Sequence, residues 1–487
     1  MRDPASSPSL AAGLVFVASA AVLVVEILGI RLLAPYVGLT LETTTTIIGA
    51  VLAGIAAGAA LGGRAADRVD PRLLLPLLLA AGGALAIATV PLVRLLGSTL
   101  RGGGDLAALV IALTALLPPA AALSAVTPAV AKLQLRDLGA TGAVVGRLSA
   151  WATAGGLAGT FAAGFVIVPL LATDVALYSL GVLLVGLALA LGKGGAPWSG
   201  SMIALVAGAA VFGGVAVAVG VPCDAETRYH CARIDVDPQR ASGRTLVLEN
   251  LNHSYVDLDD PTRLKFDYVR WIGDAIDGMA PAGAPLDGVF LGGAGFTLPR
   301  YLPATRPGSR ARVLEVDGAL VELARERLEL RTGRDLEVVV GDARVTLARE
   351  ATASADLLVG DAFGARAVPW HLSTVEFARE IRRVLRPRGL YALNVIDQGP
   401  LSLARAEAAT LRAVFADVAL VAVPGAGGGP GGGNLVLLAS ETALPSGVRT
   451  TARDARTYDG PATARFAAGA EPLRDVDAPA DQLLSRR

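Results

Sequence analysis

Seven apolar stretches occupy the first 221 residues and constrain the fold more than any other feature of the sequence. Each approaches the roughly 20 residues that a helix needs to cross the hydrocarbon core of a bilayer. Small residues crowd these stretches, as in AGIAAGAALGG, and small residues let helices in lipid pack closely. We therefore expect residues 1–222 to form a compact bundle of about seven membrane-spanning helices, with no cleavable signal peptide. The stretches cover approximately residues 10–30, 43–62, 73–96, 106–131, 148–170, 173–191 and 201–221.

From about Asp224 onward the composition becomes that of a soluble protein. Short runs with strand character fill residues 223–286 and predict a small β-subdomain. From residue 287 onward, strand-like runs alternate with helix-like runs, beginning with DGVFLGGAG and TLPRYLPA. This alternation predicts a parallel sheet covered by helices over residues 287–443, with an antiparallel pair formed by its last two strands. Residues 444–487 are expected to form an irregular tail.

Charge and motif content exclude several functions. The 43 basic and 43 acidic residues balance, so no basic excess points to a nucleic-acid partner. No GxxxxGK[ST] sequence is present, which argues against a P-loop nucleotide site. The three histidines are scattered along the chain, and we expect no bound metal.

Glycines and carboxylates follow the first four expected strands of the α/β domain. Ligands of open parallel sheets bind beyond the carboxyl ends of the strands. Each carboxylate alone is also typical of a helix N-cap, but four successive strand ends of this kind indicate a nucleoside site. The pattern is that of the S-adenosylmethionine type of Rossmann-like fold and not of a dinucleotide site. The residues concerned are Gly292, Gly293 and Gly295, then Glu315 and Asp317, then Asp342, and finally Asp361.

Several segments resemble the spermidine synthases, which are polyamine aminopropyltransferases. The likeness covers about residues 228–440 and is carried by LGGAGFTLPR, VLEVDGALVELAR, VVVGDAR, LLVGDAF and PWHLSTVEFARE. The upstream segments YHCARIDV and RTLVLENLNHSYVDLDDPTRLKFDYV resemble the N-terminal β-subdomain of that family. The apolar half is similar to the N-terminal part of fused, multi-span members.

The resemblance implies a role for each matching position. Decarboxylated S-adenosylmethionine would be the cosubstrate, with S-adenosylmethionine itself as the other possibility. Asp361 would help to deprotonate the attacking amine, and Tyr268 would line the amine channel. The cosubstrate positions are Gly292, Gly293 and Gly295 in the turn, Glu315 at the ribose hydroxyls, Asp342 at the adenine amino group, and His230 and His253 where glutamine is usual.

Two acidic residues of the family pattern are absent from this chain. Gly295 stands in place of the aspartate of GGGDGG, and Gly364 stands in place of the second aspartate of DSxDP. Val269 follows Tyr268, where a polar residue is usual. Since burying an ammonium group without a counter-charge is costly, these changes affect the amine half of the expected site.

Three functions are compatible with these features. The first is a membrane-anchored aminopropyltransferase that acts on a diamine such as putrescine. The second is a methyltransferase that uses S-adenosylmethionine on a lipid or amphipathic substrate. The third is a transporter or scaffold whose soluble domain senses a nucleoside without catalysis. The expected partners are a small amine, the lipid bilayer of the cell membrane and a second copy of the chain.

The side of the membrane that carries the soluble domain is open from the sequence. Cys223 and Cys231 would form a disulfide in an oxidising compartment and would be ordinary thiols in the cytosol. Basic residues near the span ends favour a cytosolic N-terminus, with eight on the N-terminal side against five on the other. Seven spans would then place the domain outside, whereas S-adenosyl cosubstrates are made in the cytosol. An eighth span or a re-entrant break at Pro118 and Pro119 would reverse that placement.

Overall fold

The computed structural model describes residues 7–101, 103–135, 138–192, 208, 220–364, 368–425, 427–445, 447–448 and 450–484. Contacts divide the chain into two compact units. The first comprises Met1–Cys231 and Glu249–Leu251, and the second comprises Ala232–Leu248 and Asn252–Arg487.

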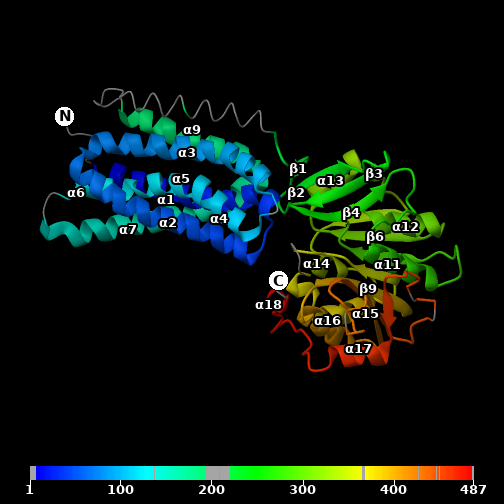
Figure 1. The fold of residues 1–487 in the computed structure, drawn as a ribbon. Coiled ribbons are helices and arrows are strands. Elements are labelled where there is room, and N and C mark those ends of the chain that lie inside the picture. Colours follow the sequence, from blue (N-terminus) through cyan, green and yellow to red (C-terminus); the bar gives the residue numbers. More distant parts are fainter. Residues whose placement is uncertain are drawn as a thin grey trace. The chain divides into compact units, whose positions relative to one another are not determined.

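The first unit is a bundle of long helices (Figure 1). Among the described residues, six helical segments are long and apolar enough to cross a membrane, and they match the first six expected spans. The seventh expected span, residues 201–221, lies outside the described residues except for 208, 220 and 221. The segments are α1 (Pro8–Val37), α2 (Leu41–Arg68), α3 (Pro71–Thr99), α4 to α6 (Gly104–Ala115, Leu117–Ser124, Val126–Gln134), α7 with η3 and α8 (Thr141–Ala162, Ala163–Ile167, Val168–Leu170), and α9 (Thr173–Gly192).

The fourth of these segments is interrupted where the sequence contains paired prolines. Pro118 and Pro119 lie in the first turn of α5, directly after Leu116 ends α4. Proline is tolerated in a first turn because the amide there needs no partner within the helix. The three short helices together still form one segment long enough to cross a membrane. The prolines therefore divide this span without giving evidence for an additional one.

Glycines allow the helices of the bundle to approach at backbone distance. A Cβ atom at Gly58 of α2 would collide with the backbone of Ala121 in α5. A Cβ atom at Gly155 of α7 would likewise collide with the backbone of Phe16 in α1. This close packing is what the abundance of small residues predicts for helices in lipid.

Two sheets organise the residues beyond the bundle. The small sheet has the order β1-β2-β3-β4, and the large sheet has the order β12-β10-β11-β9-β8-β5-β6-β7 in the described chain. The five strands from β9 to β7 are parallel, and β10 to β12 add an antiparallel edge. The strands are β1 (Ala225–Glu226), β2 (Cys231–Val236), β3 (Gly243–Leu248), β4 (Leu251–Asp257), β5 (Asp287–Leu291), β6 (Arg310–Glu315), β7 (Leu336–Val340), β8 (Ala355–Gly360), β9 (Leu385–Asp397), β10 (Asp417–Ala422), β11 (Gly433–Ser440) and β12 (Arg456–Tyr458).

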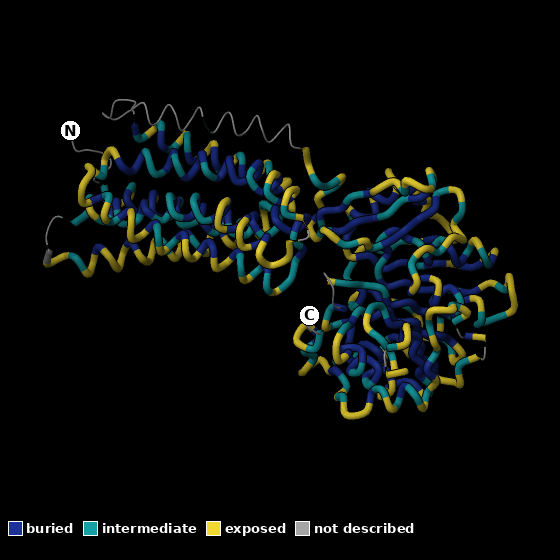
Figure 2. The backbone as a smooth tube through the Cα atoms, viewed as in Figure 1, coloured by how far each residue is buried: buried dark blue, intermediate teal, exposed yellow. Residues whose placement is uncertain are grey.

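Helices connect the strands of the large sheet and complete a Rossmann-like domain. The expected fold class, a helical bundle followed by such a domain, is confirmed. Figure 2 shows the strands of this domain as a largely buried layer, with exposed residues on the surrounding helices and loops. The helices are α11 (Asp267–Gly278), α12 (Thr297–Thr305), α13 (Gly318–Arg327), α14 (Ala343–Leu347), α15 (Val375–Val384), α16 (Ser402–Arg412), α17 (Gly460–Ala467) and α18 (Ala480–Leu483).

The expectation that residues 444–487 form an irregular tail is partly wrong. β12 pairs antiparallel with β10, and Tyr458 is the partner of Leu420. Asp459 then caps α17 by accepting a hydrogen bond from the amide of Ala462. The tail orders because its apolar side chains, among them Tyr458 and Leu473, are buried in the same core as the sheet.

Candidate functional site

The ends of four neighbouring parallel strands are held side by side. The amide of Asp361 donates to the carbonyl of Leu291, 3.0 Å away, and the amide of Gly292 donates to that of Leu314, 2.9 Å away. The amide of Gly341 donates to the carbonyl of Glu315, also over 2.9 Å. These bonds bring the segments after β8, β5, β6 and β7 to one edge of the sheet. The carboxyl ends of parallel strands are where such sheets bind ligands.

The glycine turn after β5 packs against the protein itself. Gly292 has φ +87°, and a Cβ atom there would lie 2.7 Å from the carbonyl oxygen of Asp361. A Cβ atom at Gly293 would meet the ring of Phe296 at 2.8 Å, and one at Gly295 would meet Cβ of Ser254 at 2.7 Å. All three positions thus exclude side chains because of neighbouring protein atoms. A direct role in cosubstrate contact stays a prediction.

Glu315 holds this turn in place. Its Oε2 accepts hydrogen bonds from the amides of Gly293 (2.7 Å) and Ala294 (3.3 Å), and its Oε1 accepts one from the amide of Asp317 (2.9 Å). The side chain is buried. An ionised carboxylate has about four lone-pair positions, so one remains for a ribose hydroxyl. The expected ribose role is therefore compatible with the observed geometry.

Asp342 is an N-cap, as its alternative interpretation from the sequence allowed. Its Oδ1 accepts a hydrogen bond of 2.8 Å from the amide of Arg344 at the start of α14. Its Oδ2 lies 3.1 Å from Nε2 of His371. Asp317 caps α13 in the same manner. Binding of an adenine amino group by Asp342 stays a prediction, and His371 is a neighbour that the sequence analysis did not identify.

Asp361 lies at the centre of a chain of polar side chains. Its Oδ2 accepts a hydrogen bond from the hydroxyl of Tyr268 at 3.1 Å, and its Oδ1 accepts one from Nδ2 of Asn394 at 2.8 Å. Oδ1 of Asn394 in turn accepts a hydrogen bond from Nδ2 of Asn434 at 3.1 Å. The expected catalytic pair is thus in direct contact. Chains of this kind fix the position of a carboxylate.

Burial sets the protonation of this pair. Desolvation raises the pKa of Asp361 to about 6, although the hydrogen bonds from Asn394 and Tyr268 lower it. Desolvation, followed by the charge of Asp361, raises the pKa of Tyr268 well above its ordinary value. Tyr268 therefore stays a hydrogen-bond donor at neutral pH. A carboxylate with a pKa close to neutrality is suited to accept a proton and release it again.

Asn394 and Asn434 were missed from the sequence. Asn394 lies on β9 in the run ALNVID, and Asn434 lies on β11 in the run NLVLLAS. An amide inside an apolar strand needs a partner, because buried polar groups are nearly always hydrogen-bonded. The sequence could therefore have predicted that each asparagine has a hydrogen-bond partner, but not which residue that partner is.

The two histidines expected at the site are placed differently. His253 precedes Ser254 on β4, and Ser254 accepts a hydrogen bond of 3.1 Å from the amide of Gly295. Side chains alternate along a strand, so His253 is directed to the face opposite Ser254. His230 belongs to the first unit, where its Nδ1 lies 3.8 Å from Oε1 of Glu249. Neither histidine is joined to the strand-end residues by the contacts described above, and binding of cosubstrate by either stays a prediction.

The chain is similar over part of its length to a curated enzyme. No protein-family model matches the sequence. A curated polyamine aminopropyltransferase of Vibrio vulnificus (strain CMCP6) is 28% identical over 186 residues, which are 38% of this chain and 59% of that enzyme. The match therefore spans somewhat more than half of the length of that relative.

Three solved structures align with the chain, each with a TM-score below 0.5. A probable spermidine synthase from Corynebacterium glutamicum ATCC 13032 aligns with a TM-score of 0.48 and 28% identity, over 52% of this chain and 95% of that one. The spermidine synthase from Thermotoga maritima aligns with a TM-score of 0.34 and 17% identity, over 54% and 86% of the two chains. Human methyltransferase-like protein 13, in complex with SAH, aligns with a TM-score of 0.31 and 18% identity, over 44% and 96%.

Proposed function

We propose that this chain, which is similar in sequence to a polyamine aminopropyltransferase, is a membrane-anchored aminopropyltransferase. It would transfer an aminopropyl group from decarboxylated S-adenosylmethionine to a small amine such as putrescine. The observation that carries the proposal is the contact between Tyr268 and Asp361 at the edge of the sheet, next to the glycine turn. The six apolar helical segments among the described residues support the membrane anchor.

The proposed reaction is a substitution at carbon. The neutral amine nitrogen attacks the carbon of the aminopropyl group that is bonded to the sulfonium sulfur. A C–N bond forms as the C–S bond breaks, the electron pair of that bond goes to sulfur, and methylthioadenosine leaves. The attacking nitrogen loses one proton, which passes to the carboxylate of Asp361. Free amines have pKa values near 10, so a base that holds and deprotonates the ammonium group is required.

The surrounding residues keep the carboxylate in a reactive state. Asn394 and Tyr268 each donate one hydrogen bond to Asp361, one to each oxygen. Both bonds favour the ionised form and counteract desolvation. At pH 7 a group with a pKa of about 6 is mostly ionised but accepts a proton readily.

The absence of two aspartates of the family pattern supports one alternative function. Gly295 and Gly364 replace the two aspartates of the family pattern, so the described site offers fewer charges to a dication. Among the described residues, the nearest neighbour of a Cβ atom at Gly364 would be Pro369 Cγ at 3.9 Å, so none of them excludes a side chain there. This observation favours an uncharged or singly charged acceptor. A methyltransferase that acts on a lipid or amphipathic acceptor is the alternative function.

The test uses the purified full chain in detergent. Incubation with decarboxylated S-adenosylmethionine and a panel of amines should release methylthioadenosine, measured by chromatography. Asp361→Asn should abolish the release, whereas Asp454→Asn, at an exposed position, should not change it. Label passing from methyl-labelled S-adenosylmethionine to lipid would favour the alternative. Binding of the donor without turnover of either kind would contradict both.

A further inference from the structure

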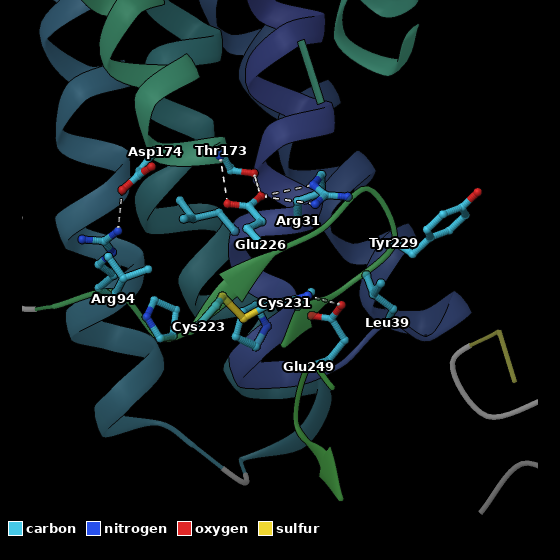
Figure 3. A pocket seen from close by; sticks show the side chains of 15 residues that line it. Arg31, Leu39, Arg94, Thr173, Asp174, Cys223, Glu226, Tyr229, Cys231 and Glu249 are labelled. Carbon is cyan, nitrogen blue, oxygen red and sulfur yellow. Dashed lines mark hydrogen bonds and ion pairs between the residues drawn. A yellow bond between two sulfur atoms is a disulfide. The ribbon is translucent and has the colours of Figure 1, made fainter. Parts of the chain in front are cut away.

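A short segment after the bundle is fastened to one end of it. Nη1 of Arg31, near the end of α1, donates to the carbonyl of Arg228 at 2.9 Å, and its Nη2 donates to the carbonyl of Thr227 at 2.6 Å. The same guanidinium pairs with Oε1 of Glu226 at 3.3 Å. At the start of α9, the amide of Thr173 donates to Oε2 of Glu226 at 3.0 Å. Figure 3 shows Arg31, Thr173 and Glu226 among the residues that line a pocket at this end.

That end of the bundle is opposite the beginning of α1. The helix starts at Pro8, and Arg31 lies 23 residues further along its 30-residue length. At 1.5 Å per residue this is a separation of roughly 35 Å, which exceeds the thickness of the hydrocarbon core. The start of α1 and the segment from Glu226 to Arg228 therefore lie on opposite sides of a membrane that the bundle crosses. This conclusion does not depend on the number of spans between residues 192 and 220.

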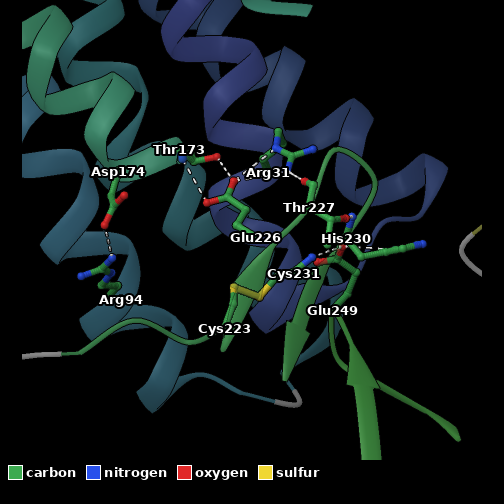
Figure 4. The surroundings of a disulfide bond; sticks show 10 residues. All are labelled: Arg31, Arg94, Thr173, Asp174, Cys223, Glu226, Thr227, His230, Cys231 and Glu249. Carbon is green, nitrogen blue, oxygen red and sulfur yellow. Dashed lines mark hydrogen bonds and ion pairs between the residues drawn. A yellow bond between two sulfur atoms is a disulfide. The ribbon is translucent and has the colours of Figure 1, made fainter. Parts of the chain in front are cut away.

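The only two cysteines of the chain form a disulfide at the fastened end. Cys223 and Cys231 are joined, with Cα atoms 5.3 Å apart (Figure 4). Glu226 lies between them in the sequence and holds the loop to Arg31. Disulfides persist in oxidising compartments and are rare in the cytosol. The disulfide thus indicates which side of the membrane this end faces.

Basic residues provide independent support. Nζ of Lys132, near the end of α6, lies 2.7 Å from Oδ1 of Asp67 in α2, so these two helix termini share an end of the bundle. Basic residues near span ends are enriched on the cytosolic side. By position in the sequence, eight basic residues lie near span ends on the N-terminal side and five on the other side. They are Arg2, Arg64, Arg68, Arg72, Lys132, Arg136, Arg147 and Lys193 on the first side, and Arg31, Arg94, Arg101, Arg228 and Arg233 on the second.

We infer that the chain beyond Gly220, including the Rossmann-like domain, lies on the extracytoplasmic, oxidising side of the membrane. The disulfide and the basic residues select the same orientation, and they do so independently of the proposed function. The orientation has a chemical consequence for that function. Nucleoside sulfonium donors are made in the cytosol, so a transport step must deliver such a donor to the outer face before the transferase can act.

Two thiol-labelling measurements test the orientation without reference to activity. The unaltered chain should take up no maleimide before reduction and two equivalents after it. Val476→Cys adds a thiol at a side chain that is 93% exposed in the second unit, and Val69→Cys adds one just after α2 at a side chain that is 43% exposed. In intact cells, an impermeant maleimide should label the Val476 variant alone. The Val69 variant should become labelled only after the membrane is permeabilised.

Other outcomes would overturn the inference. Labelling of the unaltered chain before reduction would show that Cys223 and Cys231 are not joined by a disulfide. Labelling of the Val69 variant alone in intact cells would reverse the orientation, and labelling of both variants or of neither would also contradict it. Because turnover is not measured, failure of this inference is separate from failure of the proposed transferase activity.

Discussion

The hydroxyl of Tyr268 donates a 3.1 Å hydrogen bond to Oδ2 of Asp361, which lies 93 residues further along the chain. Tyr268 lies on α11 and Asp361 follows β8, so the bond joins a helix that precedes the large sheet to the edge of that sheet. Since this bond lowers the pKa of Asp361, it counteracts the desolvation that raises it. Together with burial and the hydrogen bond from Asn394, this contact therefore sets the pH at which the expected base is ionised.

Replacement of Tyr268 should shift the pH dependence of the reaction. In the unaltered protein the rate should fall as the pH drops through about 6, because Asp361 becomes protonated. Tyr268→Phe removes the hydrogen bond, so the pKa of Asp361 rises. As the pH is lowered, the rate of the variant should therefore begin to fall at a higher pH than that of the unaltered protein. A hydrogen bond to a charged group is worth about 1.5–3 kcal/mol, which corresponds to a loss of roughly 10- to 100-fold. Tyr229→Phe, at an exposed position, is the matched control. An unchanged pH profile in the Tyr268 variant would contradict this assignment.

The two asparagines should show coupled effects on stability. Asn394→Leu leaves the side-chain amide of Asn434 without its acceptor and Oδ1 of Asp361 without its donor. A buried polar group without a partner costs about 1–3 kcal/mol. The double variant Asn394→Leu/Asn434→Leu should cost less than the sum of the two single changes, because it removes both partners of one bond. Thermal unfolding of all four chains measures this coupling, and strictly additive costs would show that the chain of amides is not a unit.

Glu407 should make the protein less stable as the pH rises. The side chain is buried in α16, its Oε1 has no hydrogen-bond partner within the described structure, and desolvation raises its pKa to about 8. The folded state therefore binds a proton more tightly than the unfolded state, in which the pKa is near 4.5. Stability from this group is fully present below pH 4.5 and is lost as the pH rises toward 8.

A neutral replacement at this position should remove that loss. Glu407→Gln should raise the free energy of unfolding at pH 8, by an amount on the order of 2–5 kcal/mol, and should have little effect at pH 4. Thermal unfolding at the two pH values provides the measurement. Glu326→Gln, at an exposed position of α13, serves as the control and should not change the pH dependence. Equal effects of Glu407→Gln at both pH values would refute the proposed linkage.

Arg306 should be essential for the helix that carries Tyr268. Its guanidinium is buried and donates to five carbonyl groups at and beyond the end of α11, over distances of 2.9–3.1 Å. Arg306→Lys retains the charge but cannot reach all five acceptors, because an ammonium group has three donors and no planar fork. We expect a loss of about 3–5 kcal/mol in thermal unfolding. Arg310→Lys, whose side chain is 67% exposed, should cost less than about 1 kcal/mol. Similar costs for the two variants would show that the hydrogen bonds from Arg306 to the end of α11 contribute little to stability. The acceptors are the carbonyls of Ile276, Asp277, Ala280, Pro281 and Ala284.

The larger features of the fold were predictable because they depend on periodic or local patterns. Long apolar stretches predicted the helical segments of the bundle, and alternating runs predicted the parallel sheet with an antiparallel pair after it. The tail was mispredicted because β12 has only three residues, from Arg456 to Tyr458. So short a strand has no pattern of its own and forms because the outer edge of β10 accepts it.

The strand-end positions of Glu315 and Asp361 were predictable because topology brings neighbouring strand ends together. The contact of Tyr268 with Asp361 was expected from the family resemblance and not from the topology. The other partners were not predictable, since Asn394 and His371 lie 33 and 29 residues from the carboxylates that they contact. Such pairings depend on the orientation of side chains in the folded chain.

Glu315 links any occupant of the strand-end edge to the exchange of backbone amide protons. Its carboxylate accepts the amides of Gly293 and Ala294, and the remaining lone pair is the one that a sugar hydroxyl would use. A bound molecule that donates a hydrogen bond to this carboxylate would weaken the hydrogen bonds that the amides of Gly293 and Ala294 donate to it. Hydrogen–deuterium exchange at two adjacent positions would then report occupancy of the edge even in a variant that performs no chemistry.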